Sequence, residues 1–128
     1  MIQTSVKPIS KDKVKQHSYN VYVYASNLEM KNLPHQGEEI CDLPNALGIP
    51  LSVSSSHSFN DLLEELQQVK KSLDIIEDHL KAGTTVVILW EDISAGMGSL
   101  KKGSPIIYSV LSNNLSGFFD RYAMKMIE

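Results

Sequence analysis

Residues 58–83 carry apolar side chains at the spacing of one helical face, and this pattern limits the possible folds more than any other feature. Six apolar residues recur there at alternating steps of four and three: Leu62, Leu66, Val69, Leu73, Ile76 and Leu80. Ser58 is placed to cap the amino end, and Gly83 stands just beyond the carboxyl end. The pattern predicts a helix over about residues 58–82. It covers fewer than four heptads, which favours packing on a sheet over a coiled coil.

Three other segments have the composition of β-strands. Residues 84–90 are a nearly continuous apolar run, typical of a central strand covered on both faces. Residues 19–26 are rich in Val and Tyr and predict a second strand that is buried on both faces. Residues 45–54 are a weaker candidate, because Pro50 suits an edge strand or a strand end.

A second long helix is predicted near the carboxyl end of the chain. Ser104 and Pro105 have the order of an N-cap followed by proline at the first helical position. An apolar stripe continues from there and predicts a helix over about residues 105–124. Gly117 lies inside this stripe and marks a point where the helix would be weakened or broken.

Together these elements predict a single α/β domain over residues 1–128, with a central sheet that is mostly parallel or mixed. We expect residues 1–18 to form a peripheral N-terminal segment. Ligands of such folds bind at the carboxyl ends of the strands. Two loops are expected there: residues 25–36 after the first strand and residues 91–100 after the last.

Composition excludes several classes of function. A net charge of −3 over 128 residues gives no overall electrostatic basis for binding nucleic acid or an anionic membrane. No apolar run is long enough to cross a bilayer, and no signal peptide is recognisable. The single cysteine, Cys41, forms no intramolecular disulfide, so we expect a cytoplasmic protein. Cysteine and histidine residues lack metal-ligand spacing, so we expect neither a metal nor a cofactor.

Several fragments, in order, resemble a family of small phage and bacterial proteins of unknown function. Asn27 is followed nine residues later by Gln36, and "PNALGIP" covers residues 44–50, including Asn45. "TVVI" at 85–88 and "ISAGM" at 93–97 follow at the family's spacing. The resemblance extends over about residues 9–122.

The family pattern is in turn similar to the macro domain, an α/β module that binds ADP-ribose. The segment "DISAGMG" resembles the macro-domain loop whose backbone N–H groups surround a diphosphate. The resemblance implies a macro-like fold and a ligand site between the two loops. Its candidate ligand-binding residues are Asn27, Gln36, Asn45, Ser94, Ala95, Gly96, Met97 and Gly98.

The chain departs from the family pattern at positions that would bind phosphate. Met30 and Asp42 stand where the family has arginine, and Pro34 and His35 stand where it has glycine. His35 and the pair Glu91–Asp92 could supply acid–base chemistry, but exposed loop positions favour a solvated role. No catalytic residue is assigned, and binding is favoured over ADP-ribosyl hydrolysis.

Two functions follow as hypotheses. The first is a small-molecule binding module for an ADP-ribose-related or other NAD-derived nucleotide, with a divergent site. The alternative is a phage- or effector-type inhibitor that has kept the fold, lost the ligand site and binds a protein partner. Exposed apolar side chains at Met30, Leu33 and Met97 would favour the protein partner.

Overall fold

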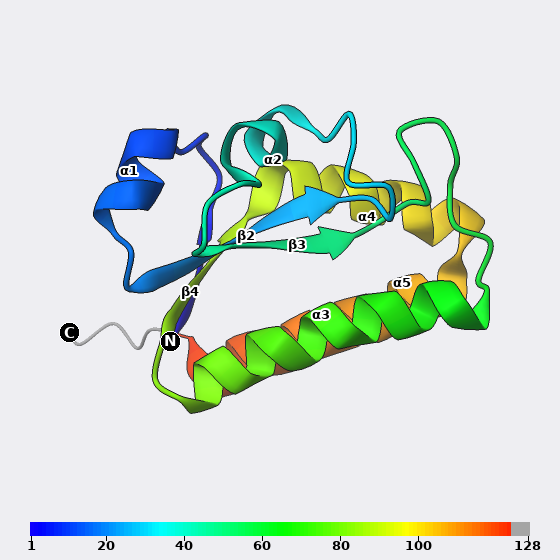
Figure 1. Ribbon diagram of the computed structural model, residues 1–128. Helices are drawn as coiled ribbons and strands as arrows, with labels where there is room; N and C mark the ends of the chain where they lie inside the picture. Colours follow the sequence, from blue (N-terminus) through cyan, green and yellow to red (C-terminus); the bar gives the residue numbers. More distant parts are fainter. Residues whose placement is uncertain (124–128) are drawn as a thin grey trace.

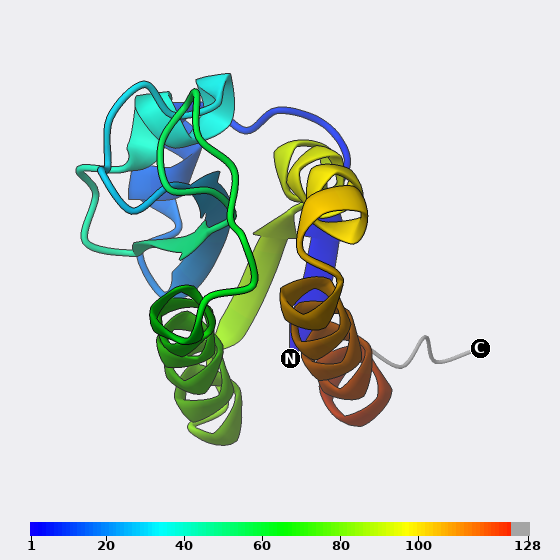
Figure 2. The same cartoon turned by 90° about the vertical axis from the view of Figure 1, so that its right-hand side faces the viewer.

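Four parallel strands form one sheet with helices on both faces (Figure 1; Figure 2). The computed structural model describes residues 1–123. The strand order is β1-β4-β2-β3, and every neighbouring pair is parallel. The elements in chain order are β1 (Ile2–Ser5), α1 (Lys11–Gln16), β2 (Asn20–Ser26), α2 (His35–Ile40), β3 (Ala46–Pro50), α3 (Leu63–Lys81), β4 (Thr85–Leu89), α4 (Trp90–Gly103) and α5 (Pro105–Tyr122). The predicted α/β fold class is confirmed.

The two central strands are covered on both faces, as their composition predicts. Along β2, Val21 and Val23 belong to the larger apolar core with α3, α4 and α5, whereas Tyr22 and Tyr24 belong to a smaller core with α1 and α2. Alternating residues of β4 divide between the same two cores. This alternation follows from the two-residue period of a strand. The result is three layers, with α3 and α5 side by side below the sheet and α1 and α2 above it (Figure 1; Figure 2).

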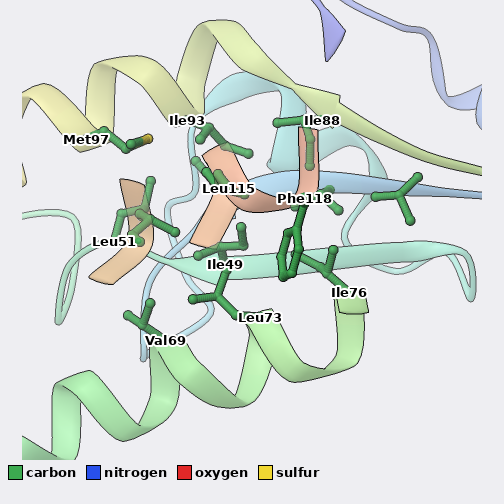
Figure 3. Close-up of a cluster of buried hydrophobic side chains, with 14 of the residues drawn as sticks. Ile49, Leu51, Val69, Leu73, Ile76, Ile88, Ile93, Met97, Leu115 and Phe118 are labelled. Carbon is green, nitrogen blue, oxygen red and sulfur yellow. The ribbon is translucent and has the colours of Figure 1, made fainter. Parts of the chain in front are cut away.

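The larger core gathers around β3 and β4 (Figure 3). Figure 3 shows Val69, Leu73 and Ile76 rising from α3 toward the sheet, and Ile93 and Met97 reaching down from α4. The α3 stripe therefore packs on the sheet, as predicted in preference to a coiled coil.

The start of α3 differs from the prediction. The helix begins at Leu63, and Ser58 is an exposed loop residue that does not cap it. Asp61 has a φ of 54°, a left-handed conformation that a helix cannot contain. Glu65 supplies the capping contacts instead, because its Oε1 accepts hydrogen bonds from the N–H groups of Asn60 (2.8 Å) and Leu62 (3.0 Å). At the other end Gly83 has a φ of 86°, as expected for a glycine just past a helix.

Asp61 caps α5 across a long sequence separation. Its two carboxylate oxygens accept hydrogen bonds from Ile106 N–H (3.2 Å) and Ile107 N–H (3.0 Å). Ser104 occupies the predicted N-cap position, but its hydroxyl accepts a hydrogen bond from Asp61 N–H (3.2 Å). Gly117 does not break α5, which is continuous to Tyr122. The predicted end of this helix at residue 124 lies outside the described residues.

The N-terminal segment contributes to the sheet itself. Ile2–Ser5 form β1, an edge strand that pairs in parallel with β4, and α1 follows on the smaller core. The predicted weaker strand is β3, the other edge, and Pro50 is its last residue. Within residues 1–123, every helix is too short or too polar to span a bilayer.

Candidate functional site

A cavity with a volume of about 550 Å³ lies at the carboxyl ends of β2 and β3, beside α4. The chain leaves β2 toward α2 on one face of the sheet, whereas it leaves β3 and β4 toward α3 and α4 on the other. Adjacent strands that lead to opposite faces open a crevice at their carboxyl ends, where α/β proteins usually bind ligands. We refer to this space as the main cavity; its three walls are residues 25–34, residues 51–59 and the face of α4 that includes Asp92.

Asn27 shapes the first wall. Its side chain is buried, with 3% exposed, and its Nδ2 donates to Lys31 O (2.8 Å) while its Oδ1 accepts from Lys31 N–H (3.4 Å). This Asx-type contact holds a tight loop in which Met30 and Asn32 have φ values of 57° and 52°. Asn27 therefore lines the cavity as predicted, but its amide already binds the chain.

The second wall is a serine-rich loop that the sequence analysis did not single out. Five of the seven residues in 52–58 are serines, and all five line the main cavity. His57 is exposed, and its Nδ1 lies 3.1 Å from Ser54 Oγ and 3.2 Å from Ser56 Oγ. The concentration of hydroxyls directly after a strand is the signal that could have identified this wall.

The third wall corrects the prediction for residues 91–100. These residues are helical, because α4 runs from Trp90 to Gly103 without an intervening loop. Ile93, Met97 and Leu100 lie at helical spacing and are buried, which favours the helix over a turn. Only the first four N–H groups of a helix lack intrahelical acceptors. The N–H groups of residues 95–98 lie past that turn, so the predicted phosphate-binding loop is wrong.

The five site residues predicted on this segment lie on different sides of the α4 helix. Ala95 and Gly96 line the main cavity. Met97 packs in the larger core, and Gly98 is exposed with no other part of the chain near its Cα. Ser94 donates a hydrogen bond from its hydroxyl to Glu91 O (3.0 Å) and does not line the main cavity.

Gln36 and Asn45 lie outside the main cavity. Gln36 is buried and binds both backbone groups of Ile9: its Oε1 accepts from Ile9 N–H and its Nε2 donates to Ile9 O, each at 2.7 Å. Asn45 lies just before β3, at the opposite end of the sheet from the main cavity. Its Nδ2 donates to the carbonyl oxygens of Val14 (3.0 Å), His17 (3.3 Å) and Asn20 (3.1 Å). Both side chains fasten the N-terminal segment to the domain.

The main cavity is rich in hydroxyl groups and poor in positive charge. Eight serines line it, together with Asn27 and Asn32. Among the described residues that line it, none is lysine or arginine, and His57 and Asp92 are the only titratable side chains. Within residues 1–123, no group of three His, Cys, Asp or Glu side chains is placed to hold a metal ion.

A smaller cavity of about 130 Å³ adjoins the first turn of α4. Asp92 lines both cavities, whereas Lys7, His35 and Glu91 line only the smaller one. The imidazole of His35 is largely exposed and lies 4.0 Å from a carboxylate oxygen of Glu39. His35 is thus apart from the serine-rich wall.

The comparisons with known proteins identify a family but no activity. No curated protein and no solved structure matches the chain. A family model described as a family of unknown function, DUF7831, matches residues 4–114. This match covers most of the chain, the end of β1, all of β2, β3 and β4, and the three walls of the main cavity. The chain belongs to this family of unknown function.

Proposed function

We propose that this chain is a small-molecule binding module whose ligand occupies the main cavity. The observation that carries the proposal is the cavity of about 550 Å³ where the carboxyl ends of β2 and β3 lead to opposite faces of the sheet. Its volume lies within the range of roughly 300–1,000 Å³ that is usual for ligand sites. Position and size together favour a ligand site over a packing defect.

The lining favours a ligand that is rich in hydroxyl groups. Serine hydroxyls both donate and accept hydrogen bonds, as sugar hydroxyls do. Leu51 and Phe59 add an apolar surface beside the serines, which suits a ring. The proposed ligand is therefore an NAD-derived molecule, such as one related to ADP-ribose, that places a ribosyl or nucleoside part in the main cavity and keeps any phosphate outside it. The macro-domain resemblance supports this class, although the predicted diphosphate loop is a helix.

We favour binding over turnover. Ser54 and His57 lie 3.1 Å apart, but Ser56 shares the same imidazole nitrogen. An activated serine needs a base whose imidazole is oriented by a third group. Within residues 1–123, no carboxylate forms an ion pair with His57. The contacts of Ser54 and His57 are those of a tight turn, closed by the bond from His57 N–H to Ser54 O (3.4 Å).

The test is thermal unfolding and calorimetry with adenosine, ADP-ribose and NAD. A ligand at 100 times its Kd should stabilise the fold by about 2.7 kcal/mol, which is a shift of roughly 8–13 °C for a chain of this size. Ala95→Trp places a large side chain in the main cavity from an exposed position on α4 and should abolish the shift. Lys102→Trp, exposed on the same helix but outside the cavity, is the matched control and should retain it.

The absence of any shift across the panel would refute the proposed ligand class. A shift that persists in Ala95→Trp would place the ligand elsewhere on the protein. Heteronuclear NMR spectra of the unmodified chain with adenosine would then show which residues the ligand touches.

A second candidate is the protein-interaction scaffold. Leu33 and Met97 are both buried, so of the three residues expected to mark a partner surface only Met30 is exposed. A different group favours a partner: Leu62, Leu63 and Ile106 are 50%, 67% and 61% exposed.

Asp61 brings the segments that carry these three residues close together, because it precedes Leu62 and its carboxylate accepts a hydrogen bond from Ile106 N–H. Exposed apolar side chains gathered in one place are typical of protein contact surfaces. If the chain acts as a phage inhibitor, it should capture a protein from a lysate of the phage's host. Loss of this capture in a Leu63→Lys variant that still folds would support this function. Equal capture by both chains would refute it.

A further inference from the structure

The proposal here rests on the proposed function and concerns the charge of the ligand in the main cavity. Among the described residues, Asp92 is the only acidic side chain that lines this cavity, and it is half-buried in the first turn of α4. Within residues 1–123, no lysine or arginine is within ion-pair distance of Asp92. A carboxylate is negatively charged at neutral pH. The cavity therefore presents one negative charge and no lysine or arginine to balance it.

The amino end of α4 does not reverse this charge. A helix N-terminus carries about half a positive charge and commonly binds anions. In this chain Glu91 and Asp92 occupy the first turn and place two carboxylates at that end. Lys7 lines the smaller cavity beside Asp92 but not the main cavity. On the side of the main cavity, the two carboxylates therefore outweigh the half charge of the helix end.

From these charges we infer that Asp92 makes the main cavity selective for an uncharged or positively charged polyhydroxylated ligand, such as a nucleoside, and against its phosphate ester. The serine hydroxyls and Asn32 supply hydrogen bonds that a neutral sugar can use. A carboxylate can also accept hydrogen bonds from sugar hydroxyls, as the acidic residue of dinucleotide-binding folds does with a ribose. A diphosphate would instead bring negative charge to a wall that has no cation for it.

The size of the effect follows from Coulomb's law. At an effective dielectric constant of about 40, between the values for bulk water and for a protein surface, two unit charges about 6 Å apart change an affinity by roughly tenfold. Replacing Asp92 by Asn keeps the shape and the hydrogen-bonding capacity of the side chain but removes its charge. In this variant, the ratio of the nucleotide's Kd to the nucleoside's Kd should therefore be smaller than in the unmodified chain.

The experiment measures the Kd values of adenosine, AMP and ADP-ribose by calorimetry at low salt and pH 8, above the range in which imidazoles normally gain a proton. We expect the unmodified chain to bind adenosine at least about tenfold more tightly than AMP. In Asp92→Asn this ratio should fall by roughly three- to tenfold. Glu91→Gln is the matched control, since it removes the same charge one residue away but outside the main cavity, and it should change the ratio far less.

The outcomes separate this inference from the proposed function. If AMP or ADP-ribose binds as tightly as adenosine, or if Asp92→Asn leaves the ratio unchanged, the charge selection is wrong while the small-molecule function stands. If neither adenosine nor its phosphates bind, both are overturned. Thermal unfolding of each variant without ligand shows whether it is folded.

Discussion

Two glycines of α4, Gly96 and Gly98, should respond in opposite ways to alanine. Each lies inside a helix, where alanine is favoured over glycine by about 1 kcal/mol. A Cβ at Gly98 would meet nothing within 4 Å. Gly98→Ala should therefore stabilise the fold by about 1 kcal/mol, or roughly 3–5 °C in Tm for a chain of this size.

At Gly96 the same change is opposed by close packing. A Cβ there would lie only 2.4 Å from Cδ1 of Leu51 and 3.3 Å from its Cβ. Leu51 packs in the larger core and also lines the main cavity, so its Cδ1 would have to turn toward that cavity, while its Cβ can move only with the backbone. Overpacking of this kind costs about 1–3 kcal/mol. After the helical gain, Gly96→Ala should be destabilising by up to about 2 kcal/mol.

A double-mutant cycle with Leu51→Ala isolates the clash. Once Leu51 is truncated, Gly96→Ala should stabilise that background by about 1 kcal/mol, as Gly98→Ala does in the unmodified chain. The free energy of unfolding is measured by urea denaturation followed by circular dichroism. The coupling energy between residues 51 and 96 should be about 1–3 kcal/mol.

Equal effects of alanine at Gly96 and Gly98 on the free energy of unfolding would contradict this packing. If residues 91–100 formed the loop that their sequence predicts, neither alanine would gain helical stability and Gly96 would not be coupled to Leu51. The cycle therefore tests the helical structure of α4 as well as its packing.

Three further predictions concern Gln36, Asn45 and Tyr24. Gln36→Ala leaves both backbone groups of buried Ile9 without partners and should lower the free energy of unfolding, measured in urea, by roughly 2–4 kcal/mol. Because Gln36 lies outside the main cavity, the Kd of a ligand bound there should not change. A change in this Kd of more than about twofold at 25 °C would contradict the assignment of Gln36 to a purely structural role. Asn45→Asp turns a carboxylate toward three carbonyl oxygens and should lower the free energy of unfolding more than Asn45→Ala does. If urea denaturation shows a larger loss for Asn45→Ala, the assigned contacts are wrong. Burial, and secondarily the Cys41 thiol, raises the pKa of Tyr24 above its ordinary value of 10.0. The protonated phenol is thus favoured in the folded state, so its contribution is complete below about pH 10 and is lost as the pH rises through the folded pKa. In Tyr24→Phe, the free energy of unfolding should fall less steeply as the pH rises above about 10. An unchanged slope would show that ionisation of Tyr24 does not cause the fall.

Local pattern predicted five of the nine elements in the described residues, β2, β3, α3, β4 and α5, but not β1, α1, α2 or α4. The apolar stripe of residues 66–80 has the helical period and packs on the larger core, whereas Leu62 lies before the helix and is half exposed. The apolar run of β4 is buried on both faces of the sheet, as its composition predicts. The sequence pattern failed where two local signals conflicted. In residues 91–100 the glycines favour a loop, whereas Ile93, Met97 and Leu100 favour a helix. The helix forms because these three side chains are buried together.

The candidate site was only partly predictable for the same reason. The chain sequence determined that Asn27 follows a strand and that a small-residue segment follows another, and both contribute to the main cavity. Only the tertiary structure decided that Asn45 lies at the opposite end of the sheet, that Gln36 binds Ile9, and that the serine loop completes the cavity. Local periodicity follows from backbone geometry and is readable in a short window. Which loops meet depends on strand order, and that order is set by packing between residues far apart in the chain.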